Sequence, residues 1–164
     1  MMQLVLGLCA LCSLLVIFKA PAIATAEDLD VPRRPSGKDR CPVCGMLVSP
    51  YPEWTGQVRH EDGTTVFFDG CKDLFKYLLS LDRYAPGKNR RGVAAVFVTN
   101  YYDGEIIAAR TALFVIGSNV MGPMGPELVP HRSIEAAEDF MKDHEGRRVL
   151  RFDEITETVL VEMQ

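Results

Sequence analysis

The sequence predicts an α+β fold of two consecutive ββαβ units, each with two strands, a helix and a closing strand. Short runs of β-branched and aromatic residues, bounded by turn residues, occur in both halves of the 164-residue chain. A helical pattern of apolar residues occupies a similar place in each half, at residues 69–81 and 133–144. The halves share negligible sequence identity, so the repeat is a hypothesis about structure alone.

The first unit is predicted over residues 57–99. Residues 57–68 alternate apolar and polar side chains around an Asp-Gly dipeptide, which is typical of a hairpin. Asp69 then stands where a residue caps a helix, and residues 69–81 carry an apolar stripe of Leu74, Phe75, Leu78 and Leu79. The strongly apolar residues 93–99 predict the closing strand.

The second unit is predicted from residue 106 onward. Residues 106–109 and 112–116 are short apolar runs that predict two strands. Residues 117–130 are rich in glycine and proline, which predicts a long loop. Residues 149–152 predict a short strand that closes the unit.

Two helices are predicted in this second half. Ser133 is placed to cap the first, which runs over residues 134–144, and Gly146 is placed to end it. Asp153 is placed to cap the last helix, which extends to Val161. Each prediction depends on the residue type found at a helix boundary and not on long-range contacts.

Residues 1–26 have the pattern of a secretory leader. Residues 4–18 form an uncharged, largely apolar run that is shorter than a membrane span of ~20 residues. A small-x-small pattern ends at Ala26, so we expect a periplasmic or otherwise exported protein after cleavage there. An uncleaved leader that associates the chain with a membrane is the alternative. The two leader cysteines follow leucines, whereas a lipoprotein site has a small residue there, so lipidation is not expected.

The rest of the chain is predicted to be a linker and one domain. Residues 27–40 are polar and rich in proline, and the folded domain is predicted over residues 41–164. The net charge of −4 and the lack of a basic stripe exclude nucleic acid as a partner. The sequence contains no phosphate loop, dinucleotide fingerprint or nucleophile–base motif, so we do not expect an enzyme.

The strongest chemical signal is a set of sulfur side chains in two separate stretches. Cys41-Pro-Val-Cys44-Gly-Met46 places two thiols and a thioether within six residues, and Met121-Gly-Pro-Met124 adds two thioethers. Soft sulfur donors without hard oxygen donors favour Cu(I). A glycine- and proline-rich loop has no periodic apolar face, so its methionines are candidate ligands beside the alternative of core packing.

Other interpretations of the cysteines remain open at this point. Cys41 and Cys44 could form a redox pair, half of a zinc site, or a structural disulfide. Cys71 is either a buried apolar side chain or a further thiol beside Cys44. An odd number of cysteines after the leader leaves at least one of them free or metal-bound.

The histidines are expected mainly at the surface. His60 lies in the predicted hairpin and His144 near the end of a helix. His131 follows the methionine loop, so it is a candidate ligand, although a surface position is favoured.

Three blocks together resemble the NosL family, the nitrous oxide reductase accessory proteins. They are Cys-x-x-Cys-Gly-Met at 41–46, Phe-Phe-Asp-Gly-Cys-Lys-Asp-Leu-Phe at 67–75 and Met-Gly-Pro-Met-Gly-Pro-Glu-Leu at 121–128. The resemblance covers about residues 40 to 162. It implies an exported Cu(I)-binding metallochaperone that delivers copper for metallocentre assembly in nitrous oxide reductase, or in a related copper enzyme, together with an ABC-type transporter. It also implies two ββαβ units similar to a domain of the organomercurial lyase MerB.

The resemblance carries over to particular residues. Cys44 and Met46 match the Cys-Gly-Met metal motif of the family, and Met124 matches its downstream Met-Gly. Cys41 and Met121 lie beside these positions and are further candidate ligands. A thiol–disulfide protein that uses Cys41 and Cys44, or a module stapled by zinc or a disulfide, is the alternative function.

Overall fold

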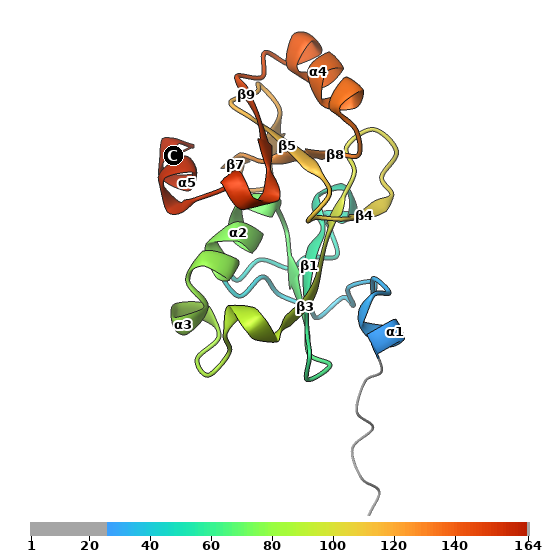
Figure 1. Cartoon of the computed structure of the whole chain (residues 1–164), viewed down its shortest axis with the longest axis vertical. Coiled ribbons are helices and arrows are strands. Elements are labelled where there is room, and N and C mark those ends of the chain that lie inside the picture. The colour runs from blue at the N-terminus through green and yellow to red at the C-terminus, as the bar shows by residue number, and fades with distance from the viewer. Residues whose placement is uncertain (1–25, 164) are drawn as a thin grey trace, which may run out of the picture.

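The computed structural model describes residues 26–163 and has an α+β fold with three antiparallel sheets (Figure 1). Residues 1–25, which hold almost all of the predicted leader, lie outside the described residues. The mixed α+β class predicted from the sequence is confirmed by these helices and sheets. Among residues 26–163, no helix is both long enough and apolar enough to cross a membrane.

The first sheet has four strands in the order β2-β1-β3-β4. The predicted hairpin is present, because Gln57 pairs with Phe67 and Val58 pairs with Val66 across β1 and β2. The helix predicted after the hairpin is divided into α2 and α3, and β3 then returns beside β1. The elements of this half are α1 (Ala26–Leu29), β1 (Gly56–His60), β2 (Thr65–Phe68), α2 (Cys71–Leu79), α3 (Leu81–Tyr84), β3 (Val93–Thr99) and β4 (Ile106–Ala108).

The second sheet has three strands in the order β8-β5-β9. In both main sheets the first strand in the chain lies between the second and the third, and a helix connects the second strand to the third. The second unit differs from the prediction, however. The strand predicted at residues 106–109 is β4, which pairs with β3 in the first sheet, and β8 takes its place beside β5 in the second sheet. The elements of this half are β5 (Leu113–Ile116), β6 (Met121–Gly122), β7 (Gly125–Pro126), β8 (Val129–His131), α4 (Ile134–Asp143), β9 (Arg148–Arg151) and α5 (Glu157–Glu162).

The prediction of one long loop over residues 117–130 is wrong. This segment contains the β6–β7 hairpin and ends in β8, which pairs with β5. The pattern of β8 was hidden because Pro130 lies within it and proline lacks the N–H group needed for a central strand. β8 is an edge strand, so the missing donor is tolerated there.

Two of the predicted helix boundaries are corrected by the structure. Asp69 does not cap α2, whose N-cap is Gly70 without a side-chain cap bond. Asp153 does not cap the last helix, because α5 begins later and Thr156 accepts a hydrogen bond from Val159 N. The Ser133 cap of α4 is confirmed by its hydrogen bond from Ala136 N.

Glycine 146 does not end α4 through its own backbone conformation. The left-handed residue is Glu145, with φ 59°, and Gly146 N then donates to Met141 O at 3.0 Å. A Cβ on Gly146 would lie 2.6 Å from Val115 Cγ1, so the glycine is needed for close packing of the helix end against β5.

The interior of the first sheet includes polar side chains that hold the preceding segment. Gln57 exchanges two hydrogen bonds with the backbone of Arg33, and Arg59, fully buried, donates to Val31 O and pairs with Asp28. Part of the predicted linker is therefore hydrogen-bonded to β1.

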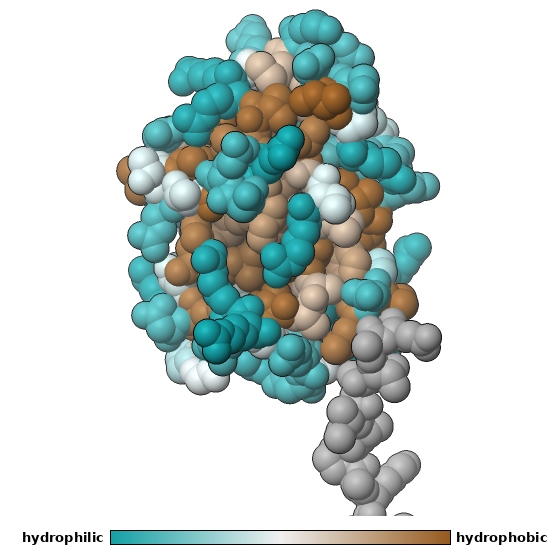
Figure 2. Space-filling model, viewed as in Figure 1, coloured by the Kyte–Doolittle hydropathy of each residue, from teal (hydrophilic) through white to brown (hydrophobic). Residues whose placement is uncertain are grey.

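On the face shown in Figure 2, hydrophilic residues surround a middle region where hydrophobic residues gather.

Candidate metal centre

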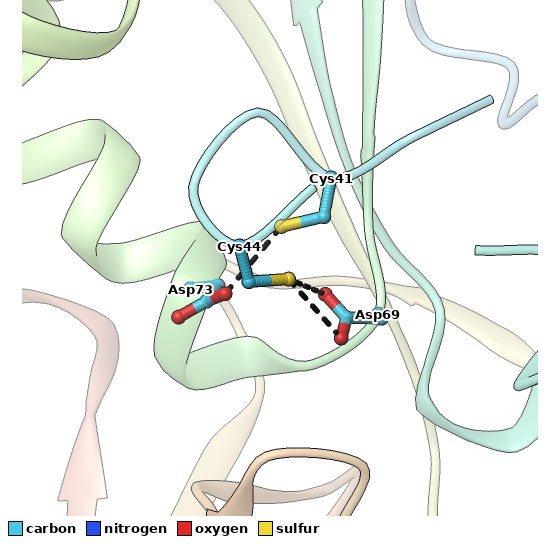
Figure 3. A group of neighbouring side chains, drawn as sticks. All are labelled: Cys41, Cys44, Asp69 and Asp73. Atoms are coloured by element: carbon cyan, nitrogen blue, oxygen red, sulfur yellow. Dashed lines mark hydrogen bonds between the residues drawn. The ribbon is translucent and has the colours of Figure 1, made fainter. Parts of the chain in front are cut away.

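The two cysteines of the motif lie on a tight loop that is closed by a single antiparallel bridge between Arg40 and Leu47. Cys41 N donates to Met46 O at 2.9 Å, and Gly45 N donates to Cys41 O at 2.8 Å. Gly45 has φ +80°, a conformation that glycine adopts without the steric cost of a side chain. The loop thereby brings both thiols toward the start of α2 (Figure 3).

Two carboxylates meet these thiols. Asp69 follows the end of β2 and accepts a hydrogen bond from Cys44 Sγ at 3.2 Å. Asp73 lies in the first turn of α2 and accepts from Cys41 Sγ at 3.5 Å. One ligand atom from each of the four residues lies within 4.8 Å of the other three (Figure 3). This Cys/Asp cluster is the candidate metal site.

The environment of the cluster favours the protonated thiols. Burial raises the pKa of Cys44 to about 11, and the hydrogen bond with Asp69 acts in the same direction. Burial also raises the pKa of the Cys41 thiol. A redox-active thiol needs a lowered pKa, so this environment disfavours the redox-pair interpretation. A metal ion would have to displace a proton from each thiol that it binds.

Cys71 does not belong to this cluster. Its side chain is 2% exposed, and burial together with the nearby charge of Glu127 raises the pKa of its thiol. The structure records Cys41, Cys44 and Cys71 as free thiols. The buried apolar role predicted for Cys71 fits this position.

The predicted methionine ligands lie in two segments, one before α2 in the sequence and one after it. Met46 is half-buried at the end of the cysteine loop. Met121 and Met124 belong to the β6–β7 hairpin and its turn, where they are 57% and 45% exposed. Such exposure excludes the alternative that these two methionines fill the core. Lys72 Nζ donates to Met124 O at 2.8 Å, so the hairpin contacts the same helix turn as the cysteine loop.

Neither carboxylate of the cluster is predicted as a ligand from the sequence. The sulfur motifs predict soft donors without hard oxygen donors, and Asp69 is predicted as a helix cap. The available signal was the presence of two aspartates, Asp69 and Asp73, where a predicted strand passes into a predicted helix. Only the position of the cysteine loop shows that both carboxylates meet the thiols.

Two histidine predictions are wrong. His131 is fully buried and packs against Phe140 and Tyr101, at ring-centroid distances of 4.7 and 6.0 Å. His60 is also buried, and its Nε2 lies 2.8 Å from the Tyr77 hydroxyl. Neither residue belongs to the Cys/Asp cluster, which is the group of close metal-binding side chains found among residues 26–163.

A comparison with protein-family models gives a match to NosL over residues 32–160. This chain belongs to the NosL family. The resemblance predicted from the three sequence blocks is therefore confirmed.

Individual NosL proteins are similar over most of the chain. The chain is 30% identical over 125 residues to the copper-binding lipoprotein NosL of Stutzerimonas stutzeri, which covers 76% of this chain and 65% of that protein. It is 32% identical over 124 residues to the copper-binding lipoprotein NosL of Achromobacter cycloclastes, which covers 72% and 64%. The chain thus spans slightly less than two thirds of the length of these curated relatives.

A solved NosL structure shares the fold. The crystal structure of the copper chaperone NosL from Shewanella denitrificans matches with a TM-score of 0.66 and 28% sequence identity, and the match covers 78% of this chain and 97% of that one. The α+β architecture is therefore similar to that of NosL. The further likeness to MerB stays a prediction.

Proposed function

We propose that this chain is an exported Cu(I) metallochaperone that delivers copper for metallocentre assembly in nitrous oxide reductase or a related copper enzyme. The observation that carries the proposal is the contact of one helix turn with two sulfur-bearing loops, within a chain of the NosL family. An ABC-type transporter is the expected partner in this assembly, and the export follows from the predicted leader and the lipoprotein names of the relatives.

The proposed ligands are Cys44, Met46 and Met124, with Cys41 and Met121 beside them. Thiolate and thioether sulfur suit Cu(I), and a thioether has no proton to lose when it binds. Asp69 accepts the hydrogen bond of the Cys44 thiol, so an acceptor lies next to the proton that copper would displace. The two carboxylates also favour the approach of a cation.

Delivery by ligand exchange follows from the exposure of the thioethers. Because Met121 and Met124 are exposed, a sulfur or imidazole of the client can reach copper before all of the chaperone ligands leave. Copper would then never be free in solution during the transfer. The expected product is a copper-loaded client and a chaperone whose thiols have recovered their protons.

The proposal is tested by anaerobic Cu(I) titration of reduced residues 27–164 against a competing chelator, with native mass spectrometry for stoichiometry. We expect tight binding of one Cu(I). A chain that fails to compete with the chelator would contradict the proposal.

We expect Met124→Leu to weaken Cu(I) binding by about 10-fold, or ~1.4 kcal/mol. Leucine keeps an apolar side chain of similar size but removes the sulfur, and Met124 is too exposed for its packing to stabilise the fold strongly. Chelator competition measures the affinity, and thermal unfolding should show little change. Met141→Leu, on α4, is the matched control, and equal affinities of all three proteins would contradict the ligand role of Met124.

A structural zinc site is the second candidate, and the two carboxylates are the observation that favours it. Cys41, Cys44, Asp69 and Asp73 supply four donors, the number that a closed tetrahedral zinc site requires. The same titration with Zn²⁺ distinguishes the two functions. Loss of the fold when zinc is removed, with no displacement of zinc by Cu(I), would favour the structural site.

A further inference from the structure

Two buried side chains attach the β6–β7 hairpin to the first turn of α2. Lys72 is 7% exposed, and its Nζ donates to Met124 O at 2.8 Å. Glu127 is 3% exposed and directly follows β7, and its Oε1 accepts from Lys72 N at 2.5 Å and from Leu128 N at 2.9 Å. We call this pair, Lys72 and Glu127, the latch.

Glu127 of the latch has the role that a capping side chain usually has at the start of a helix. The first N–H groups of a helix need acceptors, and a preceding aspartate commonly supplies one. Asp69 does not do so here, because it lies one residue before the N-cap Gly70 and its carboxylate faces the Cys44 thiol instead. Glu127 supplies the acceptor from 55 residues away, so the cap of α2 belongs to the segment that carries the methionines.

The surrounding backbone is shaped to admit the Glu127 side chain. A Cβ on Gly70 would collide with Glu127 Oε2, and a Cβ on Gly122 would lie 3.1 Å from Glu127 Cγ. Gly70 has an extended backbone, so the requirement there is space and not conformation. The hairpin's own ladder, Met121 with Pro126 and Gly122 with Gly125, joins the hairpin only to itself. Its fixed position against α2 therefore depends on contacts such as those of the latch.

We propose that Lys72 and Glu127 are positioning residues that hold Met124 beside the cysteine loop, so that its thioether joins the copper site while the latch is closed. This inference rests on the proposed function. The Met124 side chain is 45% exposed, so packing does little to fix it, and the bond from Lys72 to its carbonyl fixes the backbone instead. Opening of the latch would withdraw a thioether while the backbone hydrogen bonds that close the cysteine loop stay in place.

The decisive experiment is a double-mutant cycle between Lys72→Leu and Met124→Leu, read as Cu(I) affinity. Leucine at position 72 keeps an apolar stem, removes the donor and adds no thioether that could itself bind Cu(I). We expect Lys72→Leu to weaken binding about 10-fold in the wild-type background and to have no further effect in the Met124→Leu background. A merely structural role would give the same loss in both backgrounds. The control is Lys142→Leu, at an exposed lysine on α4 that pairs with Asp139.

A second measurement does not depend on the folding of the Lys72 variant. If the latch and copper binding are coupled, copper must stabilise the latch by the same factor by which the latch strengthens copper binding. We therefore expect Cu(I) to slow hydrogen exchange at the Lys72 amide in the wild-type protein but not in Met124→Leu. Equal protection in both proteins, or additive losses in the cycle, would overturn the latch. A wild-type chain that binds no Cu(I) would overturn the proposed function itself.

Discussion

Cys44→Ser is expected to lower the Cu(I) affinity by more than about 100-fold, since even a residue behind a metal ligand commonly contributes 10–100-fold. Serine replaces a soft sulfur with a hard oxygen that Cu(I) disfavours. The serine hydroxyl can still donate to Asp69, so the loop contact is retained and the thermal stability should change little. The measurement is chelator competition under reducing, anaerobic conditions, together with thermal unfolding.

Cys71→Ala is the matched control for this variant. Cys71 is a buried thiol only one residue from Lys72, but it is outside the Cys/Asp cluster. We expect its loss to reduce stability modestly and to leave the copper affinity unchanged. If Cys44→Ser binds Cu(I) as tightly as the wild type, then Cys44 is not a copper ligand and the ligand set has to be reassigned.

The second large effect is expected in the acid stability of the protein, through His131. This ring is fully buried, and within residues 26–163 neither Nδ1 nor Nε2 has a hydrogen-bond partner. Burial, together with the nearby charge of His144, lowers the pKa of His131 to about 4. The folded state therefore holds this imidazole neutral.

The pH range of the effect follows from the two pKa values. An unfolded chain protonates a histidine near pH 6.5, whereas the folded chain does so only near pH 4. Unfolding therefore takes up a proton between these values, and the free energy of unfolding falls as the pH drops from 6.5 toward 4. Above pH 6.5 His131 does not lower the free energy of unfolding. By pH 4 it lowers this free energy by about 3 kcal/mol.

His131→Phe tests this assignment by urea unfolding at several pH values. Phenylalanine keeps a ring among the aromatic neighbours and removes two buried nitrogens without partners. We expect the variant to be at least as stable as the wild type at pH 7.5 and to lose much less stability between pH 6.5 and pH 4. Part of the slope should remain, because burial also lowers the pKa of His60. An unchanged slope in the variant would show that His131 does not control the acid response.

The features that the sequence predicts well are local. The β1–β2 hairpin follows from alternation around a turn dipeptide. The Ser133 cap follows from a hydroxyl that accepts a hydrogen bond from the N–H of Ala136, three residues later. The sulfur motif at 41–46 is equally local, because Gly45 and the flanking residues close the loop by themselves. Each of these features depends on residues within a few positions of one another.

The errors occur where a distant contact changes the role of a residue. Asp69 has the residue type of a helix cap, but the N-cap position is Gly70, and the Asp69 carboxylate accepts from Cys44, 25 residues earlier. Glu127 then caps the helix from 55 residues away. β8 contains a proline and becomes a strand only because β5 offers an edge beside it.

By itself, therefore, the sequence determined the α+β class, the order of most strands and helices, and the sulfur-rich stretches that identify the family. It could do so because backbone preferences and short turns depend on neighbouring residues. Only the tertiary structure decided that Asp69 and Asp73 face the thiols, that His131 is buried, and that Lys72 and Glu127 join the methionine hairpin to α2. Those decisions depend on burial and on hydrogen bonds between distant segments, because a buried polar group has to find its partner wherever the fold places one.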